Sequence, residues 1–494
     1  MKIIIPENLD LIAITALNKP DFKFNIEVFQ YLISLLTWIP NQNREYTDQK
    51  FIPLNSSILQ KNGIRDFPLY RDYLEEAGIW HWQPYKPGEK SRAFRLNEKY
   101  QTTVRISTPP NTKFWLRIKR NEANVARASN RHKHLTKWFN EHFTIDADKA
   151  EVFAQRKYIE EVAHGDPAAV NRYNSNMLAI ANIKDKSYRL TSDSRGRFYS
   201  PLTNVSTDLR QFISYNGERL TNIDIVNSQP FLSTVLFSPS FWQSNNREQI
   251  SVNDISYQIR RKLLSEFEAV QPSNNEFAKI NMAKCFNPTP SISFPIYWRS
   301  NLSQIDTLLT PSITNIPIFP NNNSTSTLML TKNSVSLYSS DIQAYSFKTE
   351  QGEFYEYFQE KLSEVDSSFG KMRRSEIKTI FYESIFGKYI PVHQLKPNMA
   401  VFHKAFPNVS KFFRSLKFKQ HNVLACALQS IEAELVIMRV AKKYSEAFPN
   451  RPIYTIHDSI VVEESLAQEA TKIFRQELKR SLGRIPKLTS ECWG

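Results

Sequence analysis

Apolar residues at helical spacing, followed by two short β-rich runs, organise the first hundred residues of the chain. Phe29–Ile39 is an apolar helical run, and residues 56–64 (SSILQKNGI) predict a short capped helix that ends in an Asn-Gly turn. Residues 67–79 again have apolar residues at helical spacing, and residues 80–97 predict two strands around a Pro-Gly turn. The order helix, turn, helix and hairpin predicts a winged helix-turn-helix domain in residues 1–105.

The hairpin of this predicted domain carries basic residues. In a winged helix, Lys90 and Arg92 would contact nucleic-acid phosphates while the second helix enters a groove. The same element order also fits a small α/β packing domain without a ligand, or a module that binds another protein. The sequence leaves these alternatives open.

The next region, residues 106–190, is predicted to be mainly helical and is strongly basic. Its segment FWLRIKRNEANVARASNRHKHLTKWF (114–139) interleaves Lys and Arg with aromatic residues. This pattern suits a track for nucleic acid, and it also suits a solvated helix face. From residue 191 to 494, strands and helices alternate, and we expect a mixed α+β fold for this region. Residues 312–335, rich in Asn, Ser, Thr and Pro, predict an inserted loop.

The composition of the chain predicts a polyanionic partner. The chain has 64 Lys and Arg against 49 Asp and Glu, a net charge of +15, which favours nucleic acid or an anionic membrane surface. No run of about 18 apolar residues could span a membrane, and the first residues make a poor signal peptide. The cysteines, Cys285, Cys426 and Cys492, are too few for a disulfide framework or a Cys-based zinc site. We therefore expect a cytoplasmic protein with reduced thiols.

Two aspartates end apolar strand-like runs that lie far apart in the chain. Asp224 is near the end of the run in ERLTNIDIVNSQPF, and Asp458 follows the run in YTIHDSIVVEE. Each one alone is explained by a turn or a helix cap. Brought together, the two carboxylates would repel each other unless a cation lay between them. In a protein that binds phosphates the natural cation is Mg²⁺, which is typically held by one or two carboxylates and by substrate phosphates.

A predicted helix in residues 372–389 (MRRSEIKTIFYESIFGKY) carries a mixed basic and aromatic edge. Arg374, Lys378, Tyr382 and Phe386 follow at steps of four residues and share one face. Guanidinium and ammonium groups suit the phosphates of a nucleoside triphosphate, and the rings suit its base and sugar. A basic pair at this spacing is also frequent on ordinary surface helices.

Together these segments resemble a polymerase superfamily. The strand with Asp224, the Arg-x3-Lys-x7-Phe-Gly helix and the His-Asp of residues 457–458 resemble motifs A, B and C of the superfamily that unites family A DNA polymerases with phage-type single-subunit RNA polymerases. SDSRGRFYSPLTN (192–204) resembles its Gly-Arg motif, and LQSIEAELVIM (428–438) resembles the Gln-bearing helix before motif C. All five appear in family order between about residues 190 and 465. The first 190 residues match neither branch.

The resemblance implies a right-hand polymerase with palm, fingers and thumb, in which residues 106–190 would be the thumb-like part and residues 191–494 the palm and fingers. It also implies two Mg²⁺ ions, with Mn²⁺ as a substitute, and nucleoside triphosphates, a template and a primer or product duplex as partners. The implied metal ligands are Asp224, Asp458 and the backbone carbonyl of Ile225. The implied nucleotide contacts are Arg374, Lys378, Tyr382, Phe386 and Gln229, with Lys378 also catalytic. The implied nucleic-acid contacts are Arg195, Arg197, Gln429 and His457.

Some residues resemble the DNA-making branch and others resemble the RNA-making branch, so they disagree on whether the product contains deoxyribose or ribose. Gln229 lies where the DNA-making branch usually has a Glu that blocks the ribose 2′-hydroxyl, and Phe386 lacks the Tyr hydroxyl of the RNA-making branch. Tyr382 and the short gap between the Gly-Arg motif and Asp224 also resemble the DNA branch. Asp-x-Arg-Gly-Arg-x-Tyr at 193–199 and Ser459 after Asp458 resemble the RNA branch. The balance leans to DNA synthesis.

The leading hypothesis is therefore a DNA polymerase of a phage, plasmid or mobile element, acting in the cytoplasm of a bacterial or phage-infected cell. The alternatives are a single-subunit RNA polymerase or primase, and a non-catalytic replication initiator that has kept the polymerase shell. Glu463 and Glu464 are expected to be peripheral to the metal site, because an extended strand carries them too far from Asp458. The amphipathic helix predicted at 466–482 is expected to pack under the palm.

Overall fold

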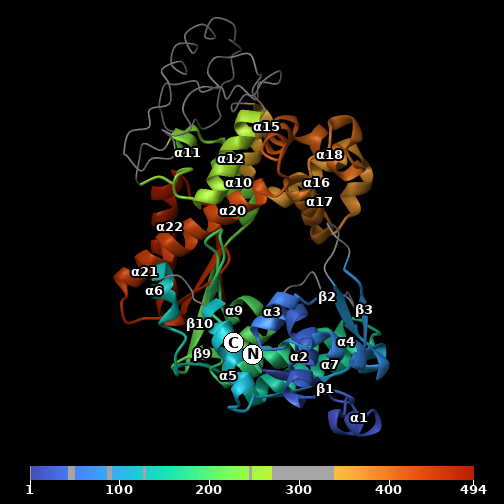
Figure 1. Cartoon of the computed structure of the whole chain (residues 1–494). Coiled ribbons are helices and arrows are strands. Elements are labelled where there is room, and N and C mark those ends of the chain that lie inside the picture. Colours follow the sequence, from blue (N-terminus) through green and yellow to red (C-terminus); the bar gives the residue numbers. More distant parts are fainter. Residues whose placement is uncertain (1, 43–50, 86–91, 126–129, 244–247, 270–338) are drawn as a thin grey trace, which may run out of the picture.

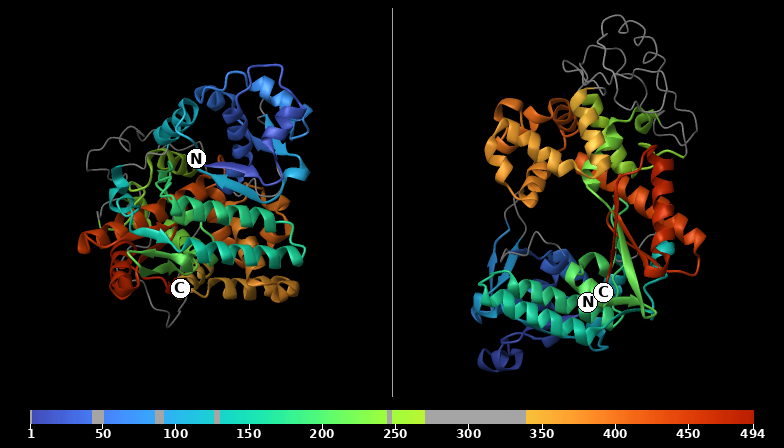
Figure 2. Two further views of the ribbon diagram at one scale, coloured as in Figure 1. Left: turned by 90° about the horizontal axis from the view of Figure 1, so that it is seen from below. Right: turned by 180° about the vertical axis from the view of Figure 1, so that it is seen from behind.

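The computed structural model describes residues 2–42, 51–85, 92–125, 130–243, 248–269 and 339–494. The chain is a mixed α and β protein, as the sequence predicts. A helical lobe (α15–α18, orange) and the first hundred residues (blue) lie at opposite ends, and the long strand β10 runs between these ends (Figure 1 and Figure 2). Among the described residues, none of the helices is both long and apolar enough to cross a membrane.

The first unit contains a helix-turn-helix followed by a hairpin. Its strands β2, β4 and β3 form an antiparallel sheet in that order, and β1 pairs separately with β5. The elements are β1 (Ile3–Pro6), α1 (Leu11–Leu17), α2 (Ile26–Gln42), β2 (Ile52–Pro53), α3 (Ser56–Lys61), α4 (Phe67–Glu76), β3 (Trp80–Gln83), β4 (Ala93–Leu96) and β5 (Val104–Ser107). The predicted order of elements is therefore present. The hairpin loop with Lys90 lies outside the described residues.

Local sequence explains the helix-turn-helix. The Asn55 side chain accepts a hydrogen bond from the Ser57 backbone N–H (2.9 Å) and caps α3. Gly63 has a positive φ of 87°, which lets the chain turn sharply before α4. The aromatic ring of Phe94 packs on Trp80 from the hairpin, with 4.8 Å between ring centroids, and on Phe67 from α4. These contacts fix the hairpin against the second helix.

The region 106–190 is mainly helical, but its elements belong to two different cores. Helix α5 (Lys113–Val125) buries Trp115 and Ile118 in the core of the first unit, beyond the boundary at residue 105. Strand β6 (Phe143–Ile145) joins the central sheet through β9. Between and after them lie α6 (Lys133–Thr136), α7 (Ala147–Ala163) and α8 (Ala169–Lys184), of which α7 and α8 pack on each other.

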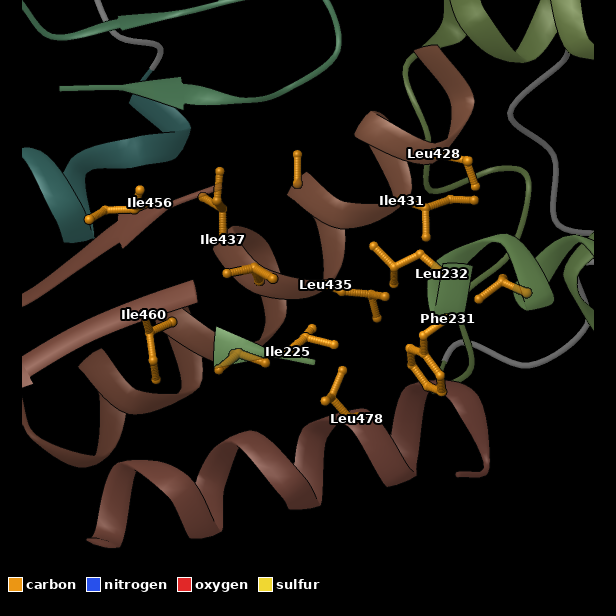
Figure 3. Close-up of a cluster of buried hydrophobic side chains, with 14 of the residues drawn as sticks. Ile225, Phe231, Leu232, Leu428, Ile431, Leu435, Ile437, Ile456, Ile460 and Leu478 are labelled. Atoms are coloured by element: carbon orange, nitrogen blue, oxygen red, sulfur yellow. The ribbon is translucent and has the colours of Figure 1, made fainter. Parts of the chain in front are cut away.

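The central sheet has six strands in the order β11-β12-β10-β9-β6, with β13 also paired to β10. The strands are β9 (Ile213–Tyr215), β10 (Glu218–Ile225), β11 (Ile453–Ile456), β12 (Ser459–Glu463) and β13 (Leu488–Cys492), in addition to β6. Residues from strands and helices interdigitate against this sheet, among them Ile225, Ile460, Leu435 and Leu478 (Figure 3). The helix predicted at 466–482 is α22 (Ala467–Leu482), which buries Leu478 there.

The remaining helices lie around the central sheet and in the lobe. Helix α9 (Pro201–Asn204) and the π-helical segment η9 (Glu434–Ala441) contact strands of this sheet. Helices α20 (Val423–Ala433) and α21 (Lys442–Ala447) adjoin η9, and α10 (Ser228–Ser233) and α12 (Tyr257–Ala269) pack on α20. Helix α11 (Pro239–Gln243) follows α10 in the chain. The lobe consists of α15 (Ser340–Gln351), α16 (Phe354–Val365), α17 (Arg374–Phe386), α18 (Pro397–Ala405) and α19 (Pro407–Ser415). Phenylalanine rings of α16, α17 and α18 fill the interior of the lobe and pack α17 against its two neighbours. The predicted insert at 312–335 lies outside the described residues.

Candidate active site

Asp224 and Asp458 lie at the same end of two adjacent strands. Strands β10 and β12 are antiparallel, and Asp224 of β10 is directly opposite Ser459 of β12. Asp458 precedes Ser459 in the two-residue turn between β11 and β12. His457, the other turn residue, has a positive φ of 54°, and the Ser459 hydroxyl donates to the Ile456 carbonyl across the turn (2.9 Å). The tight hairpin therefore brings the second carboxylate beside the first.

The electrostatics of Asp224 record this proximity. Burial and the neighbouring Asp458 raise the pKa of Asp224 to about 7, while the Ile225 backbone N–H, the Lys378 ammonium and Arg210 oppose the rise. The nearby cations Lys378 and Arg210 therefore do not fully compensate the negative charge of the two carboxylates. A proton or a bound cation relieves the repulsion between the two carboxylates.

The donor chemistry of this pair fits a hard divalent cation. Within the described part of the chain, no group of three or more His, Cys, Asp or Glu side chains is placed to hold a metal. A closed structural zinc site is therefore not present there. Two carboxylates without thiolate ligands suit Mg²⁺ or Mn²⁺, which take their other ligands from water and substrate phosphates. The side chain of Ile225 is buried in the core (Figure 3), so only its backbone could serve such an ion.

Helix α17 presents the predicted basic and aromatic edge to this end of the sheet. One Arg374 Nη donates to Oδ1 of Asn227 (3.2 Å), which ties the start of the helix to the residues that follow β10. The Lys378 ammonium lies 5.6 Å from the ring centroid of Tyr382. Tyr382 and Phe386 stack with 5.5 Å between their centroids. Arg374 and Lys378 are exposed, whereas the opposite face of the helix is buried.

Arg374 has two further contacts within the lobe. Its Nε donates to Oε1 of Glu356 (3.0 Å), and its guanidinium lies 4.9 Å from the ring centroid of Tyr355. Both partners lie on α16, so the guanidinium is held over that helix while its other edge reaches Asn227. The side chain is thereby oriented without being buried.

The Gly-Arg segment docks on the helix that carries Gln429. Arg195 Nη1 donates to Oε1 of Gln429 (2.7 Å), and Arg195 Nε donates to Asp193 (2.7 Å). The hydroxyl of Tyr199 donates to the same carboxylate (2.9 Å), and its ring meets the His457 ring edge-on at 6.3 Å. Residues predicted from separate motifs thus form one connected surface next to Asp458.

Glu432 is the residue that sequence reasoning missed. Its side chain is 1% exposed, pairs with Arg197 (2.8 Å) and accepts a hydrogen bond from Gln229 Nε2 (2.6 Å). Burial raises the pKa of Glu432 to about 7, Arg197 lowers it, and Asp458 raises it further. The available signal was an acidic residue three positions after Gln429 in an otherwise apolar helix, where both side chains share a face.

Other acidic and basic candidates lie away from the carboxylate pair. Glu463 is opposite Leu220, at the far end of the hairpin, and pairs with Arg451 (3.3 Å). Glu464 pairs with Arg219 (2.8 Å). These positions agree with the expectation that both glutamates are peripheral.

Arg92, the described basic residue of the predicted wing, belongs to the first unit. Its guanidinium lies 5.6 Å from the ring centroid of Trp82, which Arg71 also approaches at 4.6 Å. A cation from the hairpin and one from α4, which also pairs with Asp72, therefore lie near the same ring. Contact with nucleic acid at this position stays a prediction.

Comparison with known proteins gives a distant structural match. No protein-family model matches the sequence, and no curated protein matches it. A search of solved structures finds the POL domain of Pol1 from M. smegmatis in complex with DNA primer-template and dNTP. That match has a TM-score of 0.31 and 9% sequence identity, and it covers 77% of this chain and 72% of that one. A similarity of this size does not define the activity. The activity therefore has to be inferred from the residues of the candidate site.

Proposed function

We propose that this chain is a template-directed nucleotidyltransferase that extends a nucleic-acid strand by phosphoryl transfer. The observation that carries the proposal is the juxtaposition of Asp224 and Asp458 on adjacent strands, with the Lys378 ammonium acting on Asp224 from helix α17. The order of the five motifs supports the same conclusion. Together they supply a site for cations, a site for a triphosphate and a surface for a strand terminus.

In the reaction, the 3′-oxygen of the growing strand forms a bond to the α-phosphorus, and the bond from that phosphorus to pyrophosphate breaks. Bound Mg²⁺ or Mn²⁺ would neutralise negative charge on the attacking and leaving oxygens. Asp224 and Asp458 hold the position for these cations. Lys378 binds the triphosphate and is poised to give a proton to the departing pyrophosphate, while Arg374 grips the phosphates.

The other contacts orient the two substrates. Tyr382 and Phe386, already stacked, offer ring faces to the incoming base and the nascent pair. Arg195, Gln429 and His457 contact primer or template. Catalysis of this kind depends on positioning and charge neutralisation more than on covalent chemistry by the protein.

For the product we propose DNA. Gln229 is held by Glu432 and is long enough to restrict the space around the sugar, and Phe386 has no hydroxyl to sense a ribose. The RNA-like Ser459 has a structural explanation, because its hydroxyl closes the hairpin turn. RNA synthesis is the second candidate, favoured by the Arg-Gly-Arg sequence at 195–197.

The architecture we propose is a right hand. The six-stranded sheet with α20 and α22 is the palm, α15–α19 are the fingers, and α7 and α8 form a thumb-like wall. The first unit, with its helix-turn-helix and a sheet in the order β2-β4-β3, is proposed to be a winged helix that recruits duplex or primer.

The test is an extension assay with purified protein, Mg²⁺, primed or unprimed DNA and RNA templates, and either NTPs or dNTPs. We expect extension of a primed template with dNTPs. Product only from NTPs would assign the RNA branch, and product without a primer would indicate a primase. Absence of extension in every combination, with nucleic-acid binding unaffected by loss of both aspartates, would favour a non-catalytic initiator.

A further inference from the structure

A cavity of about 690 Å³ lies where the first unit meets α8 and the segment 185–204. Its walls come from α2 and α5 on one side, and from α8 and the Gly-Arg segment on the other. This volume is within the range of about 300–1,000 Å³ that small-molecule sites occupy. The cavity is separate from the carboxylate pair, and no step of the proposed reaction uses it.

Two buried polar atoms in the cavity wall have no hydrogen-bond partner among the described residues. They are the indole N–H of Trp115 and the hydroxyl of Ser200, and each residue is only 3% exposed. Ser200 precedes helix α9, yet its side chain does not cap that helix. Buried polar groups are normally satisfied, so a donor and a hydroxyl left unsatisfied on opposite sides of one cavity point to a bound polar ligand.

The charge of the cavity favours an anion. Its charged lining residues are Lys2, Lys119, Lys186, Arg189, Glu122 and Asp185. Lys2 is paired with Asp185, and Lys186 donates to the Phe143 carbonyl. Lys119 is exposed and has no ion pair with any described residue, so it is available to a phosphate.

Aromatic groups accompany these cations. The Arg189 guanidinium lies 5.0 Å from the ring centroid of Trp38, and both residues line the cavity. Cations interleaved with aromatic rings are the usual means of binding single-stranded nucleic acid, because rings stack on bases and cations meet phosphates. The combination matches a nucleotide better than a simple anion.

Tyr199 connects this cavity to the candidate active site. It lines the cavity, its hydroxyl bonds to Asp193 beside Arg195, and its ring contacts His457. A strand held by Arg195 and His457 would therefore reach the cavity within a short distance.

We propose that the cavity binds a nucleotide, either free or as one unit of a single strand that leaves the active site. Its phosphate lies at Lys119 and Arg189, its base against Trp38, and its polar edge at Trp115 and Ser200. The choice of a nucleotide as the ligand rests on the proposed function. The observations on Trp115, Ser200 and Lys119 are independent of that function.

The test measures binding by the full chain in EDTA, so that it is independent of catalysis. Fluorescence anisotropy with labelled oligo-dT and oligo-U, and calorimetry with dTMP and UMP, compare wild type with Ser200→Ala and with the double variant Lys119→Glu/Arg189→Glu. The matched control is Lys113→Glu/Arg120→Glu, which reverses two exposed charges of α5 outside the cavity.

We expect the cavity double variant to weaken oligonucleotide binding at least tenfold and to lower the salt dependence by about 0.7 per lost phosphate contact. Ser200→Ala should weaken binding about threefold or more with an unchanged melting temperature, since that hydroxyl has no described partner to lose. Loss of dTMP or UMP binding in the same variants would show that the ligand of the cavity is a free nucleotide. An effect on oligonucleotides alone would show that the ligand is one unit of a single strand. Equal effects of the cavity and control double variants, with Ser200→Ala binding like wild type, would overturn the proposal whether or not the protein extends primers.

Discussion

Gln229 donates a hydrogen bond to Glu432 across 2.6 Å, although the two residues lie 203 positions apart in the chain. The same carboxylate pairs with Arg197. This ion pair offsets the free-energy cost of burying the Glu432 charge and does not by itself make the fold more stable. Glu432 therefore joins the Gly-Arg segment, the residues after β10 and helix α20 into one unit. We infer that it positions Gln229 and Arg197 for the substrates.

Glu432→Gln tests this positioning role. The substitution keeps the shape but leaves Arg197 without its counter-charge, so we expect kcat/KM for dNTP to fall about tenfold or more, chiefly through KM. Single-nucleotide incorporation kinetics measure both constants. Glu434→Gln is the control, since Glu434 is also largely buried but pairs with Arg439. Equal effects of the two substitutions would contradict a specific role for Glu432.

Gln229→Ala tests the choice of sugar. If the side chain restricts the space around C2′, its removal should raise incorporation of NTP relative to dNTP at least tenfold, because a steric exclusion is lost. Competing incorporation of the two nucleotides opposite one template base gives the ratio directly. Gln394→Ala, at an exposed position, serves as the control. An unchanged ratio would show that Gln229 does not select the sugar.

The raised pKa of Asp224 predicts a pH-dependent stability. A folded-state pKa near 7, above the value of about 4 in an unfolded chain, means that the fold favours the protonated carboxyl. Its contribution is complete at acidic pH and is lost as the pH rises toward 7. We therefore expect Asp224→Asn to stabilise the metal-free protein by up to about 4 kcal/mol at pH 8 and to have little effect at pH 4.

Thermal unfolding with and without Mg²⁺ checks that prediction. Added Mg²⁺ should raise the melting temperature of the wild type at pH 8, less so at pH 5, and hardly at all that of Asp224→Asn. Asp148→Asn, on the exposed part of α7, should respond to Mg²⁺ like the wild type. A Mg²⁺ response that survives in Asp224→Asn would place the ion elsewhere.

Lys378→Ala tests the assignment of the triphosphate site. Loss of the ammonium should lower kcat for incorporation by about 10²–10³, which is the usual effect of removing one group that stabilises developing charge. Lys371→Ala, an exposed lysine just before α17, should leave kcat within about twofold. Rapid-quench measurement of one incorporation separates this step from product release. A normal rate in Lys378→Ala would refute its catalytic role.

Local sequence predicted several of the individual elements, because each depends on residues close together. The capped helix at Ser56 and the amphipathic α22 follow from cap and periodicity signals. For Asp458 the sequence offered a turn only as one explanation, and the structure has a two-residue turn there between β11 and β12. The exposed edge of α17 also follows from spacing alone. These features needed no knowledge of the tertiary fold.

Features that depend on distant partners could not be predicted in this way. Glu432 is interpretable only once Gln229 and Arg197 are known to meet it. The boundary at residue 105 divides the first core from Trp115, whose burial there depends on packing against Tyr31. The cavity beside Ser200 likewise exists only where two units meet.

The central claim is that Asp224 and Asp458 together form the catalytic cation site, and Asp458→Asn tests it most directly. Extension of a primed template with Mg²⁺ and dNTPs is measured for this variant and for Glu464→Gln, which removes an acid from the far end of the same hairpin. The account predicts that Asp458→Asn loses at least about 10³ in rate while primer-template binding persists, and that Glu464→Gln extends normally. Extension by Asp458→Asn at the wild-type rate would contradict it.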